Sequence, residues 1–348
     1  MGLISPDADI TNLSTENPLT VLTNLVSADF DAVNSVILEE MQSEIELIPQ
    51  LAAHLISSGG KRVRPLLTLA SAKLCGYKGS DNAKAHIQLA AAVEFIHTAT
   101  LLHDDVVDES LMRRGNPSAN ALFGNQASVL VGDFLFSRAF QLMVKTGSLA
   151  ALDSLSNASA VLAEGEVMQL VDHGDLDMVE SRYLDIIASK TATLFESACE
   201  VGSLISDNGS DARVNALKSY GSALGICFQI TDDILDYSSN AKTLGKNVGD
   251  DFREKKVTLP VIFAYQKGSK EEKEFWQKAF DLDVETPCFD SDLNQAQALL
   301  LKHKALESCY EKAGVYAVQA KEALEFFEDS LLKTTLIELV DFCLHRQS

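Results

Sequence analysis

Cysteine is sparse and dispersed in this sequence. The six cysteines stand at positions 75, 199, 227, 288, 309 and 343, and no two of them form a C-x-x-C pair. This distribution favours neither a disulfide framework nor a zinc site, and it indicates a reducing compartment. The seven histidines form no H-E-x-x-H pattern. We therefore expect a cytoplasmic protein whose chemistry does not depend on a thiolate or imidazole metal site.

Basic residues are also few. The 348 residues include 29 Lys and Arg against 50 Asp and Glu, a net charge of −21. This balance excludes nucleic acid as a partner and argues against a broad basic surface for anionic lipid. No uncharged apolar run is long enough to cross a membrane. The first 18 residues carry acidic side chains and no Lys or Arg, so they resemble neither a secretory signal nor a transit peptide.

Strand signals and helix breakers are scarce. No proline lies between positions 118 and 259, and apolar residues recur mainly at helical spacing. We expect a flexible N-terminal arm at 1–17 and one all-α domain at 18–348, a bundle of ten or more helices around a central apolar cavity. The expected helices cover 19–48, 64–76, 81–108, 125–145, 148–172, 176–202, 211–238, 257–267, 270–280 and 294–346, the last broken near Gly314 and Ser330.

Against this background, a cluster of carboxylates follows an apolar stretch at 101–108. Asp104 and Asp108 are four positions apart, so on a helix they lie on one face, about 5–6 Å from each other. Oxygen ligands of this kind suit Mg²⁺, which usually binds through one or two carboxylates plus substrate phosphates. Alone, the cluster could equally be a solvated acidic turn at a helix end.

A second copy of the pattern favours a metal site over a solvated turn. Asp232 and Asp236 repeat the D-D-x-x-D spacing 128 positions later (232 − 104), and Gln229 can share their face. Two such motifs on separate apolar helices predict a cavity with two facing carboxylate walls, several Mg²⁺ ions and a polyphosphate between them. The neighbouring His103 and Asp104 could instead suggest a metal-dependent phosphohydrolase, but the sequence offers no matched set of further histidines.

Several basic clusters accompany the carboxylates. Each could be an ordinary solvated loop or a set of ion-pair partners, but glycines and cations near helix starts also form anion sites. The clusters are Gly59-Gly60-Lys61-Arg62-Val63-Arg64, Arg113-Arg114, Ser189-Lys190-Thr191, and the loop Gly245–Lys256.

Taken in order from Gly59 to Pro260, these motifs resemble the trans-isoprenyl diphosphate synthases, or polyprenyl synthetases. The resemblance implies the all-α isoprenoid synthase fold, a homodimer, and the transfer of prenyl groups. It implies that the metal ions, three Mg²⁺ per active site, are held by Asp104, Asp105, Asp108, Asp232 and Asp236.

The resemblance also implies two diphosphate sites. An allylic diphosphate such as farnesyl diphosphate would contact Arg113, Lys190, Thr191, Gln229, Lys246 and Lys256. Isopentenyl diphosphate would contact Lys61, Arg64, His97 and Arg114. Lys255 stands where many relatives have glycine, so the sequence leaves open which of Lys255 and Lys256 acts. The catalytic set implied is Asp104, Asp108, Lys190, Gln229, Asp232 and Asp236.

The residues just before the first motif bear on product length. In the family, a bulky aromatic residue four or five positions before the motif stops the product early, whereas this sequence has Thr100 and Ala99 there. We expect a tunnel that continues past Ile96, with Phe136 and Phe140 as candidates for its floor.

The sequence of residues 94–140 most resembles those of octaprenyl, solanesyl and decaprenyl synthases. Such enzymes supply quinone side chains. We expect the product to pass to a membrane prenyltransferase. The alternatives are a short-chain synthase, a terpene cyclase and a non-catalytic regulatory subunit. Small Ala99 and the two intact acidic motifs argue against them.

Overall fold

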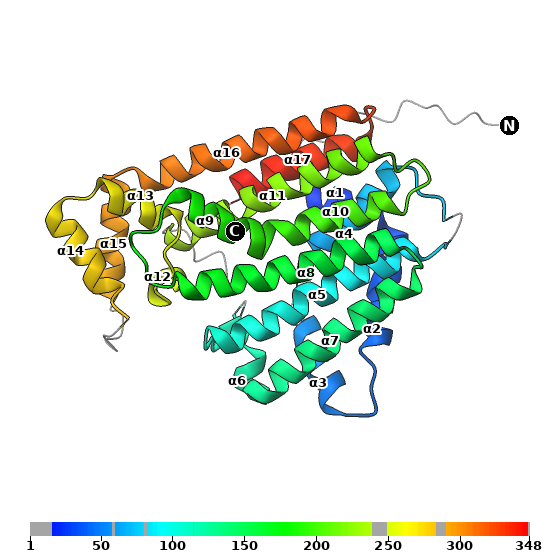
Figure 1. Cartoon of the computed structure of the whole chain (residues 1–348), viewed down its shortest axis with the longest axis horizontal. Helices are drawn as coiled ribbons and strands as arrows, with labels where there is room; N and C mark the ends of the chain where they lie inside the picture. The colour runs from blue at the N-terminus through cyan, green and yellow to red at the C-terminus, as the bar shows by residue number, and fades with distance from the viewer. Residues whose placement is uncertain are drawn as a thin grey trace.

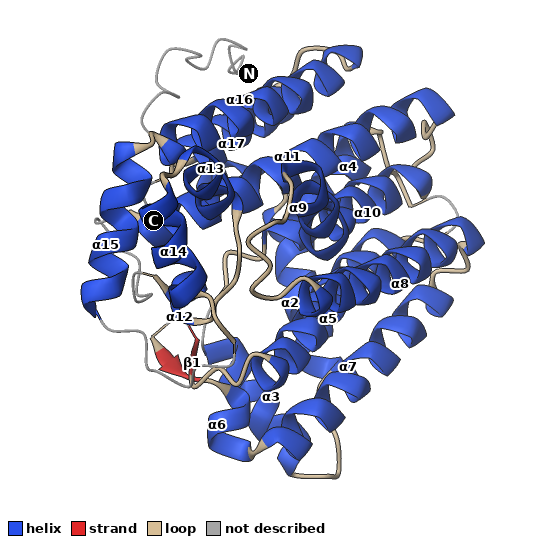
Figure 2. Ribbon diagram, turned by 60° about the vertical axis from the view of Figure 1, so that its left-hand side comes forward, coloured by secondary structure: helices blue, strands red, loops and turns tan. Residues whose placement is uncertain are grey.

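The computed structural model describes residues 16–57, 60–79, 82–113, 115–238, 249–282 and 290–346. Within these ranges the regular structure is helical except for one two-stranded antiparallel sheet, so the expected all-α fold is confirmed (Figures 1 and 2). The elements are α1 Pro18–Leu25, α2 Ser27–Glu40, α3 Leu47–Ser57, α4 Val63–Leu74, α5 Ala85–Val107, β1 Met112–Arg113, β2 Asn116–Pro117, α6 Ala119–Phe123, α7 Asn125–Lys145, α8 Leu149–Val171, α9 Glu180–Ile187, η2 Ala188–Ala192, α10 Thr193–Leu204, α11 Asp211–Tyr237, α12 Asp250–Arg253, α13 Leu259–Lys267, α14 Lys270–Ala279, α15 Asp290–Lys302, α16 Ala305–Ala323, η4 Leu324–Phe326 and α17 Leu331–His345. The arm expected at 1–17 lies outside the described residues, apart from Glu16 and Asn17.

Two long helices form the centre of the bundle. α5 packs against α7, α4 and α2, and α10 packs against α11, α4 and α8 (Figure 1). Their inner faces carry side chains such as Phe95 on α5, Phe195 on α10 and Tyr220 on α11, each fully buried. The two acidic motifs occupy the C-terminal ends of α5 and α11, so both lie where the core meets the connecting loops.

Glycines allow α11 to approach its neighbours closely. A Cβ added at Gly225 would lie 2.6 Å from the Cα of Ala192, and one at Gly221 would lie 2.5 Å from the carbonyl oxygen of Phe195. The small residues at 221–225 therefore permit close helix packing. The contact fixes the helix that carries Asp232 and Asp236 against η2, which carries Lys190.

Several helix boundaries differ from those expected. The segment 19–48 contains α1 and α2, which meet at Val26 with a bend of 85°. The last expected helix is not broken at Gly314, which lies inside α16; the break falls at Lys304, whose φ is 52°. The break near Ser330 is confirmed, because the Ser330 side chain accepts the Lys333 backbone N–H and caps α17.

Two helices are long and apolar enough to cross a membrane by length and composition, Ala85–Val107 and Asn125–Lys145. Charged residues interrupt both helices, Glu94 in the first and Asp133 and Arg138 in the second, so neither is an uncharged apolar run of the kind that the sequence analysis found absent. In α5, 67% of the apolar window is buried within the fold, so its hydrophobicity is that of a core helix. In α7 the share is 44%, and an apolar face stays uncovered in the single chain.

Candidate active site

The first acidic motif closes α5. Asp104 lies in the last turn and Asp108 is the residue at which the helix ends. Burial raises the pKa of Asp104 to about 7, although the charge of Lys190 lowers it. Asp108 accepts a hydrogen bond of 2.8 Å from the Lys256 ammonium, which comes from the segment after the second motif. This ion pair therefore joins the first acidic motif to the segment that follows the second motif.

Asp105 has a different role from its neighbours. Its side chain is buried and accepts hydrogen bonds from Arg113, with the Nε donating to both carboxylate oxygens at 2.9 and 3.0 Å. The Arg113 Nη2 lies 2.7 Å from the same carboxylate. The β1–β2 hairpin, which the sequence did not predict, holds Arg113 there. Arg113 therefore engages both oxygens of Asp105, which the sequence analysis assigned to metal binding.

The second acidic motif closes α11. One oxygen of Asp236 accepts the backbone N–H of Asp250 and the other accepts that of Asp251, both at 3.1 Å. Burial, together with the charge of Asp251, raises the pKa of Asp236 to about 8. Asp232 lies one turn earlier and forms a 3.0 Å ion pair with Arg346, a residue outside every predicted motif.

A hydrogen-bonded chain of buried side chains runs beside Asp232. Thr191 donates to the Gln229 amide oxygen at 2.8 Å, and the Gln229 amide nitrogen donates to Asp233 at 2.7 Å. Tyr183 donates to the other oxygen of Asp233 at 2.6 Å. Burial raises the pKa of Asp233 well above its usual range. The chain fixes Thr191 and Gln229 relative to the second motif.

Lys190 sits on a distorted turn of helix. η2 is a π-helical turn in the middle of the helix expected at 176–202, and turns of this kind are frequent at functional sites. The Lys190 ammonium donates to Glu166 and Gln169 of α8, both at 2.6 Å. The sequence analysis missed these two partners. Their spacing of three positions on one face of α8 was the available signal.

A second basic group lies on the other side of α11. The guanidinium of Arg64, in the first turn of α4, lies 4.4 Å from the Phe195 ring centre, and the Lys61 ammonium lies 5.6 Å from the ring centre of Phe342. His97 is partly buried on α5, two turns before Asp104. Arg114 and Lys246, also predicted to bind diphosphate, lie outside the described residues.

The two lysines of the 249–256 segment have different contacts. Lys256 contacts Asp108 at 2.8 Å and Glu254 at 2.7 Å. Burial lowers the pKa of Lys256, but the two carboxylates outweigh it, so the pKa lies above its ordinary value. The Lys255 ammonium instead donates to the Asp281 backbone carbonyl. Lys255 has a φ of 53°, in the left-handed region that glycine tolerates best, which explains the glycine of many relatives.

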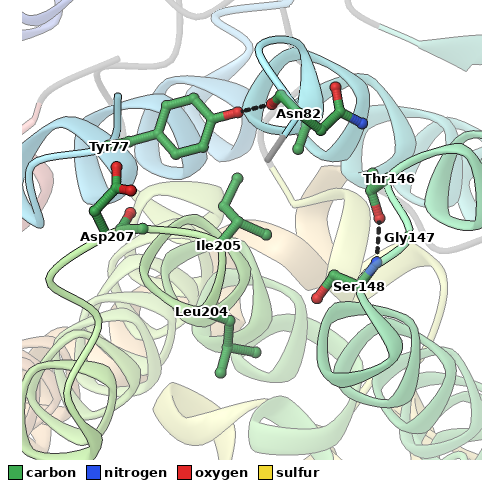
Figure 3. A pocket seen from close by; sticks show the side chains of 10 residues that line it. Tyr77, Asn82, Thr146, Gly147, Ser148, Leu204, Ile205 and Asp207 are labelled. Atoms are coloured by element: carbon green, nitrogen blue, oxygen red, sulfur yellow. Dashed lines mark hydrogen bonds between the residues drawn. The ribbon is translucent and has the colours of Figure 1, made fainter. Parts of the chain in front are cut away.

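Two cavities distinguish the ends of the bundle. One, of about 120 Å³, is lined by Gln169, Lys190, Thr191, Gln229, Asp233 and Lys256, among others, so it lies beside the second acidic motif and includes four of the residues predicted to contact the allylic diphosphate. A larger cavity of about 320 Å³ lies at the other end of α5 (Figure 3). Tyr77, Asn82, Ser148 and Asp207 line it, and none of its described lining residues is Lys or Arg. The larger cavity is therefore unsuited to a diphosphate.

The residues predicted to set product length lie beneath the first motif. Ile96 and Ala99 are fully buried on α5, and Thr100 is nearly so. Phe136 is partly buried, with its ring centre 6.1 Å from that of His103. Phe140 exposes 41% of its surface. It lies on a partly exposed face of α7, so Phe136 is the more buried of the two residues predicted for the tunnel floor.

Comparisons with known proteins place this site in a family. Residues 45–288 match the family described as Polyprenyl synthetase. The octaprenyl diphosphate synthase of Haemophilus influenzae is 44% identical over 315 residues, covering 90% of this chain and 93% of that one.

Two solved structures are also similar. One is a polyprenyl synthase from Caulobacter crescentus complexed with calcium and isoprenyl diphosphate, with a TM-score of 0.89, 48% identity, and coverage of 95% of this chain and 98% of that chain. The other is a decaprenyl diphosphate synthase from Rhodobacter capsulatus, with a TM-score of 0.87, 48% identity, and coverage of 95% and 100%.

Proposed function

The chain belongs to the polyprenyl synthetase family, and from this premise we propose that it is a prenyltransferase that extends an allylic diphosphate with successive isopentenyl diphosphates to the octaprenyl–decaprenyl range. The observation that carries the proposal is the ion pair between Lys256 and Asp108. It joins the ends of two separate motif regions around a cavity that Lys190, Thr191 and Gln229 also line. A single-motif metal site would not need this arrangement.

The residues present suit Mg²⁺ held jointly by protein and substrate. Among the described residues, no three His, Cys, Asp or Glu side chains are grouped closely enough to hold an ion by themselves. Mg²⁺ commonly binds through one or two carboxylates and completes its shell with water and phosphate oxygens. Asp104 and Asp108 on one side, and Asp232 and Asp236 on the other, would supply these carboxylates, with three ions per site as the resemblance implies. When bound, the metal ions neutralise the charge that develops on the departing diphosphate.

The cations of the site hold the allylic substrate. Lys190 and Lys256 donate to the leaving diphosphate, with Thr191, Gln229, Arg113 and the predicted contact Lys246 beside it. As the allylic C–O bond breaks, its electron pair leaves with the diphosphate, and these donors stabilise the growing negative charge. Asp105 keeps Arg113 in place through its two hydrogen bonds.

The second substrate is held on the other side. Lys61, Arg64, His97 and Arg114 bind isopentenyl diphosphate so that its double bond faces the allylic carbon. The double bond attacks the carbocation, a new C–C bond forms, and a proton passes to the released diphosphate. The apolar core below Asp104 excludes water that would otherwise quench the cation.

Product length follows from the small residues beneath the site. Ala99 and Thr100 leave the route along α5 open, and Ile96 lines it one turn further down. An aromatic residue at position 99 or 100 would fill that route. We therefore propose a long-chain product used for quinone side chains and passed from the cytoplasm to a membrane prenyltransferase.

The protein is proposed to act as a homodimer. Leu130, Phe140 and Val144 expose 67%, 41% and 65% of their surfaces on one face of α7, at helical spacing. A second copy covering this face would remove the apolar surface from water. Sedimentation of the wild type and of Leu130→Glu tests this: the variant should shift towards monomer.

The proposed activity is tested by incorporation of labelled isopentenyl diphosphate into butanol-extractable product. Incorporation should require farnesyl diphosphate and Mg²⁺, and it should stop with a chelator. Release of inorganic diphosphate without incorporation of label would instead support a phosphohydrolase. If the protein neither incorporates label nor releases diphosphate, a regulatory subunit would be supported.

A further inference from the structure

The last described residue folds back onto the second acidic motif. Arg346 follows the end of α17, and its Nη2 donates to Asp232 at 3.0 Å and to the backbone carbonyl of Phe228 at 3.1 Å. Its guanidinium lies 4.0 Å from the centre of the Phe228 ring. Only 9% of the Arg346 side chain is exposed. Because the contact is buried, it orders Arg346 much more firmly than a surface ion pair would.

The surroundings of Arg346 leave its hydrogen bonding incomplete. Its buried Nε finds no hydrogen-bond partner among the described residues. Aromatic rings separate it from the second basic group, because Phe228 lies 5.4 Å from Phe195, over which Arg64 is stacked. A buried donor without an acceptor is a group that an additional anion would satisfy. The guanidinium is therefore held at Asp232 with one donor still unsatisfied.

The other carboxylates of the two walls also have partners within the chain. Lys256 occupies Asp108, and the backbone N–H groups of Asp250 and Asp251 occupy Asp236. The partner of Asp232 is the only one of these that comes from the C-terminal end of the described chain. Arg346 lies beyond the end of α17 and belongs to no helix, so it can leave Asp232 without moving a helix of the fold.

We propose that Arg346 is an internal counter-ion that occupies Asp232 in the metal-free protein and competes there with the divalent cation. The proposal rests on the function proposed above, which assigns Asp232 to metal binding. A partly buried carboxylate is unfavourable without a positive partner, and Arg346 supplies one until the metal does. Arg346 holds one of the two Asp232 oxygens, so a metal ion that takes this oxygen as a ligand competes with the guanidinium for it. A diphosphate in the site lowers the cost of releasing the guanidinium by offering it another anion.

The test measures metal binding to the full chain with no substrate present. Mn²⁺ is the probe, and free Mn²⁺ is followed by electron paramagnetic resonance during titration. Arg346→Gln should bind Mn²⁺ about tenfold more tightly than the wild type, because hydrogen bonds to charged groups contribute roughly this much. Arg213→Gln is the matched control. Arg213 also stacks on a ring, that of Phe327 at 5.7 Å, but it lies near the other end of α11 and should leave Mn²⁺ affinity unchanged.

The site of the effect is identified by a double variant. Asp232→Asn should weaken Mn²⁺ binding, and adding Arg346→Gln to it should bring no gain. Circular dichroism checks that the variants fold, and a chain ending at His345 replaces Arg346→Gln if the latter does not. Unchanged or weaker Mn²⁺ affinity in the folded variant would overturn the proposal.

The two proposals fail separately. If Mn²⁺ affinity rises in Arg346→Gln but the wild type incorporates no isopentenyl diphosphate, the counter-ion role stands and the proposed function falls. If the wild type elongates normally and Mn²⁺ affinity does not change, only the counter-ion role is lost.

Discussion

The ammonium of Lys256 lies 2.8 Å from the Asp108 carboxylate, although the two residues are separated by 148 positions in the chain. The pair connects the end of α5 with the segment that follows α12. It gives the site one cation whose position depends on both acidic regions. The role of Lys256 can be tested against that of its neighbour Lys255, because the Lys255 ammonium donates to the Asp281 carbonyl and not to Asp108.

Lys256→Ala should lower turnover by about 10²–10³-fold, since it removes a donor to the charge that develops on the leaving diphosphate. Steady-state incorporation of labelled isopentenyl diphosphate measures the effect. Lys255→Gly is the matched control: it removes an ammonium that donates to the Asp281 backbone carbonyl, and it relieves the left-handed φ of 53°. We expect wild-type activity in Lys255→Gly and a stability equal to or slightly above that of the wild type. A larger loss in Lys255→Gly than in Lys256→Ala would contradict the assignment.

Asp104→Asn should lower turnover by orders of magnitude while leaving the fold intact. Burial already disfavours the charged form of this carboxylate, so the amide removes a desolvation cost along with the ligand. Thermal unfolding should therefore give a melting temperature at least as high as that of the wild type. Glu164→Gln on α8, an exposed carboxylate, should change neither quantity. Full activity in Asp104→Asn would remove this residue from the catalytic set.

The metal-free protein should lose stability as the pH rises from about 4 to 8. The pKa values of Asp104 and Asp236 in the folded chain are raised to about 7 and about 8, from 3.8. A raised pKa contributes stability that is fully present below the unfolded value and is lost as the pH passes the folded value. Below about pH 4 the contribution is complete, and by pH 9 it is gone.

Mg²⁺ should reverse this trend, because it binds the ionised carboxylates. Thermal unfolding with and without Mg²⁺ at pH 6 and pH 8.5 measures the effect. The gain should be larger at pH 8.5, reaching roughly 2.7 kcal/mol at a Mg²⁺ concentration one hundred times the dissociation constant. The double variant Asp104→Asn/Asp236→Asn should show a flatter pH dependence. Equal Mg²⁺ stabilisation at both pH values in the wild type would argue against these two carboxylates as the ligands.

Ala99→Tyr should shorten the product, because the phenol ring would occupy the route along α5 beneath Asp104. Chromatography of the dephosphorylated products by chain length is the measurement. Ala53→Tyr on the exposed surface of α3 introduces the same ring away from the core and should leave product length unchanged. Unaltered products from Ala99→Tyr would refute the proposed route.

The sequence alone was informative wherever function and local structure coincide. The acidic motifs at 104–108 and 232–236 lie at the ends of long helices, and helical spacing predicts which of their residues share a face. The expected all-α class followed from uninterrupted apolar periodicity. Even so, spacing suggested nothing of the difference between Asp104 and its neighbour Asp105, which pairs with Arg113 across an unpredicted hairpin.

Contacts between distant segments were beyond the reach of local patterns. Arg346 stands among ordinary residues at the chain end, and only the packing of α17 beside α11 brings it to Asp232. Glu166 and Gln169 accept hydrogen bonds from Lys190 only because a π-helical turn directs the Lys190 side chain towards α8. The exposure of Phe140 is a related case, since the sequence does not say which apolar face of α7 turns towards the core.

The most direct test of the central claim is the length of the product made by the wild-type chain from farnesyl diphosphate, labelled isopentenyl diphosphate and Mg²⁺. The account predicts all-trans products in the octaprenyl–decaprenyl range, with shorter species only as transient intermediates. Products that stop at the farnesyl or geranylgeranyl length with excess isopentenyl diphosphate, or no elongation at all, would contradict it.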